Sequence, residues 1–75
     1  MPRGFVLLNA DLGYESTLAA EMKNMEGVTD SYTVYGVYDI MLKIEADSME
    51  RLKEFIGAIR KTKGVKSSLT MLIMD

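Results

Sequence analysis

Residues 32–46, YTVYGVYDIMLKIEA, are the stretch from which the fold can be inferred. Before Gly36 the residues are β-branched, aromatic or small, as is typical of a strand. After it, apolar residues take every second position: Ile40, Leu42, Ile44 and Ala46. This period of two indicates a second strand with one buried face. Because glycine accepts the positive φ that a tight connection requires, the stretch predicts a β-hairpin that turns at Gly36.

The turn also carries groups that a simple connection does not need. In one interpretation, Tyr35 and Tyr38 form a cross-strand aromatic pair and Asp39 accepts amide protons within the turn. In the other, the backbone amides around the glycine bind an anion, Asp39 pairs with an ammonium and the rings form walls. A ligand with both a carboxylate and an amine fits the second interpretation. The residues alone leave both open.

Length and composition limit the possible functions. A chain of 75 residues is expected to form a single domain over residues 1–75 and to bury only about 60% of its unfolded surface, so self-association is a plausible source of extra stability. The chain has no histidine and no cysteine, which removes the usual zinc ligands and the commonest general base and nucleophile. We therefore expect neither a metal or other cofactor nor an enzyme.

Charge and hydropathy limit the partners. The net charge of −2 gives no general attraction to nucleic acid. A basic group near the C-terminus is best explained as cations at the end of a helix, where they complement its dipole: Arg60, Lys61, Lys63 and Lys66. No apolar run approaches the ~20 residues of a membrane span. We expect a cytoplasmic protein that neither enters membranes nor binds DNA directly.

The remaining elements follow from changes of period. The predicted elements are a strand at 4–10, a helix from Tyr14 to its end at Gly27, strands at 28–35 and 38–46, a helix from 48 to about 63 and a strand at 65–74. Gly27 and Gly64 are placed to end the two helices. Asp47, followed by Glu50, predicts a capping box at the start of the second helix.

The two halves of the chain resemble each other. Gly27-Val28 and the residues after it align with Gly64-Val65 and the residues after it, so two βαβ halves follow one another. Right-handed crossovers then interlock the halves into one antiparallel sheet of strand order 4-1-3-2, with both helices on one face. The fold class predicted is α+β, a ferredoxin-like βαββαβ sandwich.

One face of this sheet should lack a helix. Strand parity predicts that this open face carries Tyr35, Met41, Lys43, Ser68 and Thr70, with Leu72 and Met74 as further candidates. A sheet face this apolar is typical of an interface, and two such faces can pack on each other. The seven methionines suit adaptable packing better than cofactor ligation.

The chain resembles the ligand-binding domain of the Lrp/AsnC transcription regulators, the RAM domain, over all 75 residues. Three segments carry the resemblance, in the family's order and spacing: Tyr35-Gly36-Val37-Tyr38-Asp39, Gly64-Val65 and Ser67-Ser68-Leu69-Thr70. The resemblance implies homodimers formed by sheet packing, which assemble further, for example into octamers, and bind an amino-acid effector between dimers.

Site residues follow from the same resemblance. It implies that Tyr35, Gly36, Val37, Tyr38 and Asp39 bind the effector's α-amino and α-carboxylate groups, with the hydroxyls of Ser68 and Thr70 opposite. Asp39 would pair with the ammonium, whereas amides near Gly36 and the hydroxyls would take the carboxylate. The sequence does not indicate which amino acid is bound.

This chain also differs from the full-length regulators of the family that it resembles. Those regulators carry a DNA-binding helix-turn-helix domain before this one, whereas here the first strand begins within five residues of Met1. We therefore expect a stand-alone module that senses amino acids, co-assembles with full-length relatives, or both. Two alternatives are a small dimeric α+β barrel enzyme, for which Asn9 is the one inward polar candidate, and a structural assembly partner without a ligand.

Overall fold

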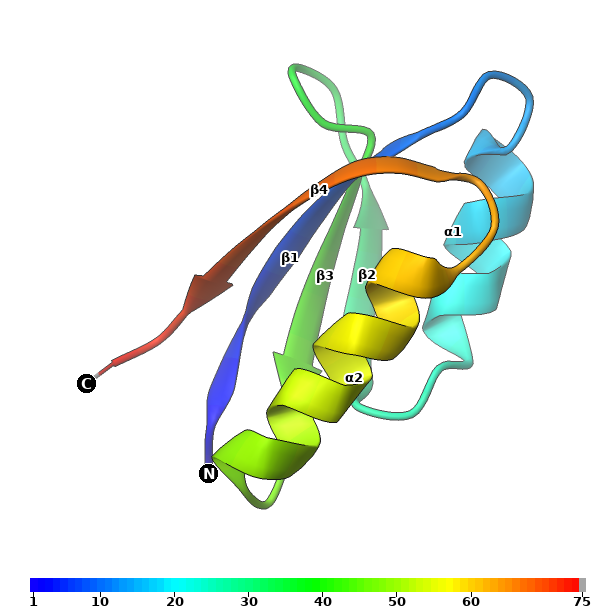
Figure 1. The fold of residues 1–75 in the computed structure, drawn as a ribbon. Coiled ribbons are helices and arrows are strands. Elements are labelled where there is room, and N and C mark those ends of the chain that lie inside the picture. Colours follow the sequence, from blue (N-terminus) through cyan, green and yellow to red (C-terminus); the bar gives the residue numbers. More distant parts are fainter. Residues whose placement is uncertain (75) are drawn as a thin grey trace.

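Six elements follow one another in the computed structural model, which describes residues 1–74. They are β1 (Arg3–Ala10), α1 (Glu15–Lys23), β2 (Val28–Thr33), β3 (Ile40–Glu45), α2 (Met49–Lys61) and β4 (Val65–Leu72). The strands form one antiparallel sheet in the order β2-β3-β1-β4, and both helices cover the same face of it (Figure 1). The predicted ferredoxin-like fold and its strand order are confirmed.

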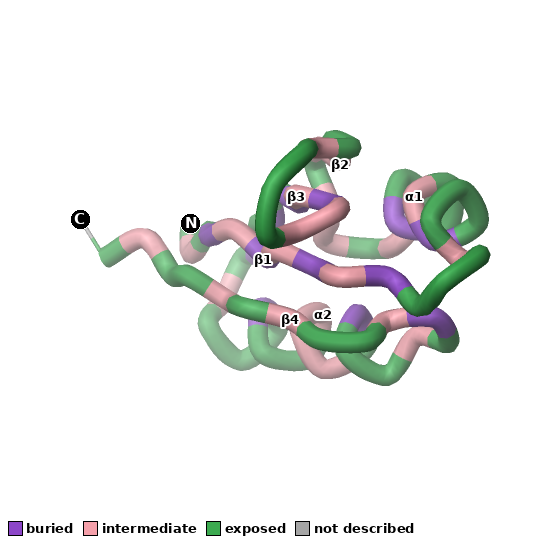
Figure 2. The backbone as a smooth tube through the Cα atoms, turned by 90° about the horizontal axis from the view of Figure 1, so that it is seen from above, coloured by how far each residue is buried: buried purple, intermediate pink, exposed green. Residues whose placement is uncertain are grey.

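The core lies between this face and the helices. Alternate residues of the two central strands are fully buried, as the period of two predicts, and they meet the buried stripes of α1 and α2. The side chains below 2% exposure are Val6, Leu8, Leu18, Met22, Ile40, Leu42, Ile44, Leu52 and Ile59. Burial of each such side chain contributes roughly 1.5–3 kcal/mol to folding. Along β1, buried and half-buried residues alternate (Figure 2).

The connection between β2 and β3 is longer than predicted. β2 ends at Thr33 and β3 begins at Ile40, so the strands predicted at 28–35 and 38–46 were too long. Residues 34–39 form the connection, which we call the 34–39 loop. The amide of Val34 donates to the carbonyl of Asp39 at 2.9 Å and closes the loop at its base. Gly36 does have the predicted positive φ, at 128°.

The helix ends also differ from the prediction. The side chain of Ser48, not of Asp47, caps α2: its Oγ accepts the Arg51 amide at 3.1 Å. The capping box on Asp47 was therefore wrong by one residue. The first helix ends at Lys23, with Asn24 as its C-cap, before Gly27. Within residues 1–74, neither helix is long and apolar enough to cross a membrane.

Two glycines, Gly27 and Gly64, occupy equivalent positions in the two halves of the chain. Gly27 and Gly64 each precede a strand and have φ values of 91° and 102°. A Cβ added to Gly27 would overlap the ring of Phe55 on α2, and one added to Gly64 would lie 2.8 Å from the ring of Tyr14, the N-cap of α1. Each half therefore packs an aromatic ring on the glycine of the other half.

The register shows which residues lie on the open face. Met41 and Lys43 lie there as predicted, since they pair with Leu7 and Phe5 and alternate with buried residues. Ser68 and Thr70 pair with the buried residues Leu8 and Val6. They and Leu72, the partner of Gly4, therefore share the helix-covered side, and their predicted placement on the open face was wrong.

Two apolar residues of β4, Leu69 and Met71, lie on the opposite side. Leu69 and Met71 pair with Leu7 and Phe5, and they are 43% and 47% exposed. The open face therefore has an apolar centre, formed by Phe5, Leu7, Tyr32, Met41, Leu69 and Met71. Tyr35 belongs to the 34–39 loop and lies beyond the strands.

Candidate functional site

The 34–39 loop projects from one end of the sheet (Figure 1). Tyr35 is fully exposed and Val37 is 81% exposed, whereas Tyr38 and Asp39 are half-buried at the base of the loop. A Cβ at Gly36 would meet no atom within 4 Å, so its positive φ, and not lack of space, favours glycine there. The tip is thus open to a ligand or to another protein surface.

Asp39 joins the loop to the end of β1. Its amide donates to the carbonyl of Leu8 at 2.9 Å, and its Oδ2 accepts the amide of Ala10 at 2.9 Å. The side chain therefore continues the hydrogen-bond ladder one step past the last paired residues, Leu8 and Ile40. Asp39 does accept an amide proton, but from a strand 29 residues away and not from its own turn.

The hydrogen bond from Ala10 fixes the Asp39 carboxylate but occupies only one of its acceptor positions. A carboxylate has about four acceptor positions, so one amide leaves room for further donors. The carboxylate is half-buried, where a charge-assisted bond is stronger than in open water. The arrangement is chemically suited to hold an ammonium at a defined position beside the exposed backbone of the loop.

Ser68 and Thr70 lie on the other side of β1 from the loop. β1 separates β3 from β4, so these hydroxyls are about two strand spacings, roughly 9–10 Å, from the β3 side of the sheet. Thr70 is also displaced along the sheet, because it pairs with Val6 and not with Leu8. One chain thus brings Tyr35–Asp39 together in a single loop but does not bring the two hydroxyls into contact with them.

Two contributors to this region were missed from the sequence. They are backbone groups of β1, the carbonyl of Leu8 and the amide of Ala10, and side-chain patterns do not reveal such groups. The irregularity of the β1–β4 register between Asn9 and Ala10 marks the same place. Asn9 does not point inward, since it shares the open-face register with Ser67 and its Nδ2 donates to Ser67 Oγ at 3.2 Å.

The whole chain matches one family of domains. The family model described as the Lrp/AsnC ligand binding domain matches residues 3–75. The crystal structure of FFRP-DM1 superposes with a TM-score of 0.93 at 32% identity and covers 99% of this chain and 100% of that one. Hypothetical protein PHS023 from Pyrococcus horikoshii gives a TM-score of 0.91 at 32% identity, with 99% and 90% of the two chains covered.

Longer proteins match over a part of their length. A homocitrate synthase from Sulfolobus acidocaldarius is 39% identical over 61 residues, which are 81% of this chain but only 13% of that enzyme. The transcriptional regulator NMB0573 of Neisseria meningitidis, solved in complex with L-Met, has the same fold, with a TM-score of 0.86 at 14% identity over 99% of this chain and 50% of that one. Because the family model matches residues 3–75 of this chain, the chain belongs to the Lrp/AsnC ligand-binding domain family.

Proposed function

We propose that the chain is a cytoplasmic, non-catalytic module that binds a small amino acid and changes the activity of a partner through its oligomeric assembly. The observation that carries the proposal is the placement of Asp39. Its carboxylate is held by the Ala10 amide at 2.9 Å, beside a loop whose glycine and exposed backbone are free to meet a second charged group. An α-amino acid offers an ammonium and a carboxylate in that arrangement.

Each site residue has a distinct role in this proposal. Asp39 accepts from the α-ammonium, and amides near Gly36 and Val37 donate to the α-carboxylate. The rings of Tyr35 and Tyr38 shield the ligand from water, which strengthens these bonds. Since β1 separates the loop from Ser68 and Thr70 within one chain, we propose that their hydroxyls reach the ligand from a neighbouring copy.

The exposed tip of the loop supports a site shared between copies. Tyr35 is fully exposed, so in a single chain its ring has no surface to pack on. The apolar centre of the open face is a second unpartnered surface. We propose that two open faces pack together as a homodimer and that dimers join through their loops into a higher oligomer such as an octamer.

Two kinds of partner fit such a module. Full-length Lrp/AsnC regulators carry a related domain, and a mixed oligomer would link effector binding to DNA binding by the relative. The chain also matches homocitrate synthases over 13% of their length. These matches favour a second kind of partner, an enzyme that carries or contacts such a domain and is controlled by it. In both cases the chain itself neither catalyses a reaction nor binds duplex DNA.

A thermal-shift screen of the twenty amino acids tests the proposal. Binding to the folded state alone adds about 2.7 kcal/mol of stability at one hundred times Kd. We expect one or a few small amino acids to raise the melting temperature of the wild-type protein and not of Asp39→Asn. If no amino acid shifts the wild type at 10 mM, or if both proteins respond equally, the proposed site is wrong.

A further inference from the structure

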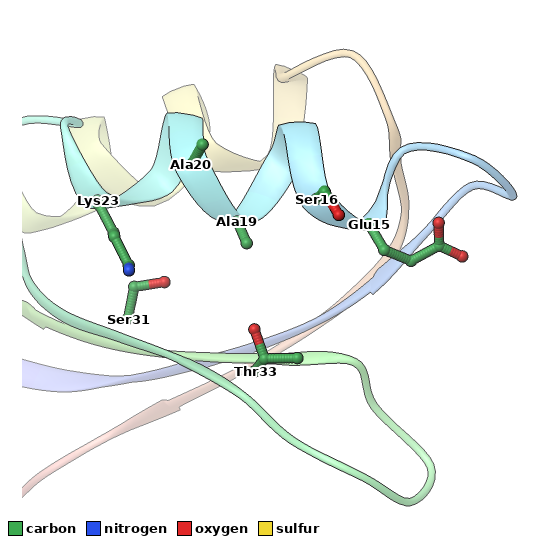
Figure 3. A pocket seen from close by; sticks show the side chains of 7 residues that line it. All are labelled: Glu15, Ser16, Ala19, Ala20, Lys23, Ser31 and Thr33. Atoms are coloured by element: carbon green, nitrogen blue, oxygen red, sulfur yellow. The ribbon is translucent and has the colours of Figure 1, made fainter.

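A groove of about 380 Å³ runs between α1 and β2, on the helix-covered side of the sheet, and its Thr33 end adjoins the base of the 34–39 loop (Figure 3). It is lined by Glu15, Ser16, Ala19, Ala20, Lys23, Ser31 and Thr33. On the helix side, Ser16, Ala19 and Ala20 are all small. Ala19 points toward the strand and Ala20 lies on the outer rim of the groove (Figure 3). In the middle of the groove, between Glu15 and Lys23, no large side chain of α1 therefore covers this edge of the sheet.

The backbone of β2 has unused hydrogen-bonding groups at this edge. Ala46 donates to the carbonyl of Pro2 and Glu45 donates to that of Gly27, so even-numbered residues of β3 face β1 and odd-numbered residues face β2. Ser31 and Thr33 lie opposite the even-numbered Leu42 and Ile40. Their amides and carbonyls consequently point away from β3, into the groove.

The two ends of the groove carry opposite charges. Lys23 hangs from the C-terminal end of α1 toward Ser31, and Glu15 stands at the N-terminal end, beyond Thr33 (Figure 3). Glu15 Oε1 accepts the Gly13 amide at 3.1 Å, which keeps the acid at that end. A copy of the same groove turned by 180° would meet each charge with its opposite. The edge is thus self-complementary, as an isologous interface requires.

We infer that the β2 edge binds the β2 edge of a second copy, antiparallel about a twofold axis at Tyr32. Ser31 then pairs with the partner's Thr33, and Thr33 with the partner's Ser31, each pair exchanging two backbone hydrogen bonds. The two tyrosines at position 32 face each other as a cross-strand aromatic pair. The small residues let the two α1 helices approach closely, with Glu15 beside the partner's Lys23.

This interface differs from the proposed effector site in the 34–39 loop, and it shares only Tyr32 with the apolar centre of the open face. It joins two sheets side by side into one continuous sheet, whereas packing of the open faces stacks them. Use of both surfaces by the same chain would give an assembly larger than a dimer. Failure of the β2-edge interface therefore leaves the open-face dimer and the proposed effector site intact.

Amide hydrogen exchange of the full chain, followed by NMR at 20 μM and 1 mM, tests the inference. We expect exchange at Ser31 and Thr33 to slow at least tenfold at the higher concentration, because edge amides become bonded to the second copy. In Ala20→Glu, two like charges meet near the axis, and this protection should be lost. Thr17→Glu, an equal charge on an exposed position outside the groove, should keep it.

Exchange of the Tyr32 amide is the control for folding, because this amide faces β3 and should stay protected in every variant. A charge exchange gives a second test: Lys23→Glu should weaken the association, and adding Glu15→Lys should restore it. Concentration-independent exchange at Ser31 and Thr33, or protection that persists in Ala20→Glu, would overturn the inference. Either result would leave amino-acid-induced thermal shifts, and hence the proposed function, unaffected.

Discussion

At the scale of single residues, Asp39 has a structural bond and a proposed binding role that two substitutions can separate. Asp39→Ala removes the acceptor of the half-buried Ala10 amide, and we expect the free energy of unfolding to fall by about 1–3 kcal/mol. Asp39→Asn keeps an acceptor oxygen and should cost much less. Urea denaturation of the two variants measures the difference. Little or no loss of stability in Asp39→Ala would mean that the bond to Ala10 contributes little.

For amino-acid affinity, unlike stability, Asp39→Ala and Asp39→Asn should have similar effects. Both substitutions remove the charge, so amino-acid affinity measured by calorimetry should fall by about 1.5–3 kcal/mol in each. The ligand would be the best amino acid from the screen. A binding constant for Asp39→Asn equal to that of the wild type would remove this residue from the site while leaving its structural bond in place.

Gly27 tests the contact between the two halves of the chain. Gly27→Ala combines a positive φ with a Cβ that overlaps Phe55, whereas Gly13→Ala has a similar φ of 88° and no atom within 4 Å. We expect Gly13→Ala to cost about 1–2 kcal/mol of stability from the backbone alone. Gly27→Ala should cost roughly 1–3 kcal/mol more, from overpacking. Similar melting temperatures for the two variants would contradict the role of Phe55.

At the scale of elements, the start of α2 gives a matched comparison. Ser48→Ala removes the oxygen that accepts the Arg51 amide and should cost about 1 kcal/mol. Asp47→Ala, the neighbouring residue that does not cap the helix, should change stability by less than about 0.5 kcal/mol. Chemical denaturation checks both values. A larger loss of stability for Asp47→Ala than for Ser48→Ala would mean that Asp47 caps the helix.

The elements also show what the sequence can predict. Ile40, Leu42 and Ile44 alternate strictly because β3 is central and buried on one side, so its parity was predicted correctly. In β4, both parities mix hydroxyl and apolar residues, because an edge strand is only partly covered, and its parity was predicted wrongly. The loop residues were identified in sequence, but the bond of Asp39 to a backbone amide depends on the tertiary fold.

At the scale of the whole molecule, the open face should control self-association. Met71→Lys places a charge on its exposed apolar centre, and we expect the dimer to weaken at least tenfold, because a buried unpaired charge is costly. Met49→Lys, on α2 and 37% exposed, is the matched control and should not weaken it. Sedimentation equilibrium measures both against the 8.4 kDa monomer. A wild type that stays monomeric at 200 μM would contradict the proposed dimer.

The proposed module recognises both charged groups of an α-amino acid. The most direct measurement is calorimetric titration of the wild-type protein with the best amino acid from the screen, with its analogue lacking the α-amine and with its carboxamide. Each charged hydrogen bond contributes about 1.5–3 kcal/mol, so removing either group should weaken binding roughly 10- to 150-fold. Equal affinity for the amino acid and the analogue without the amine would contradict the account.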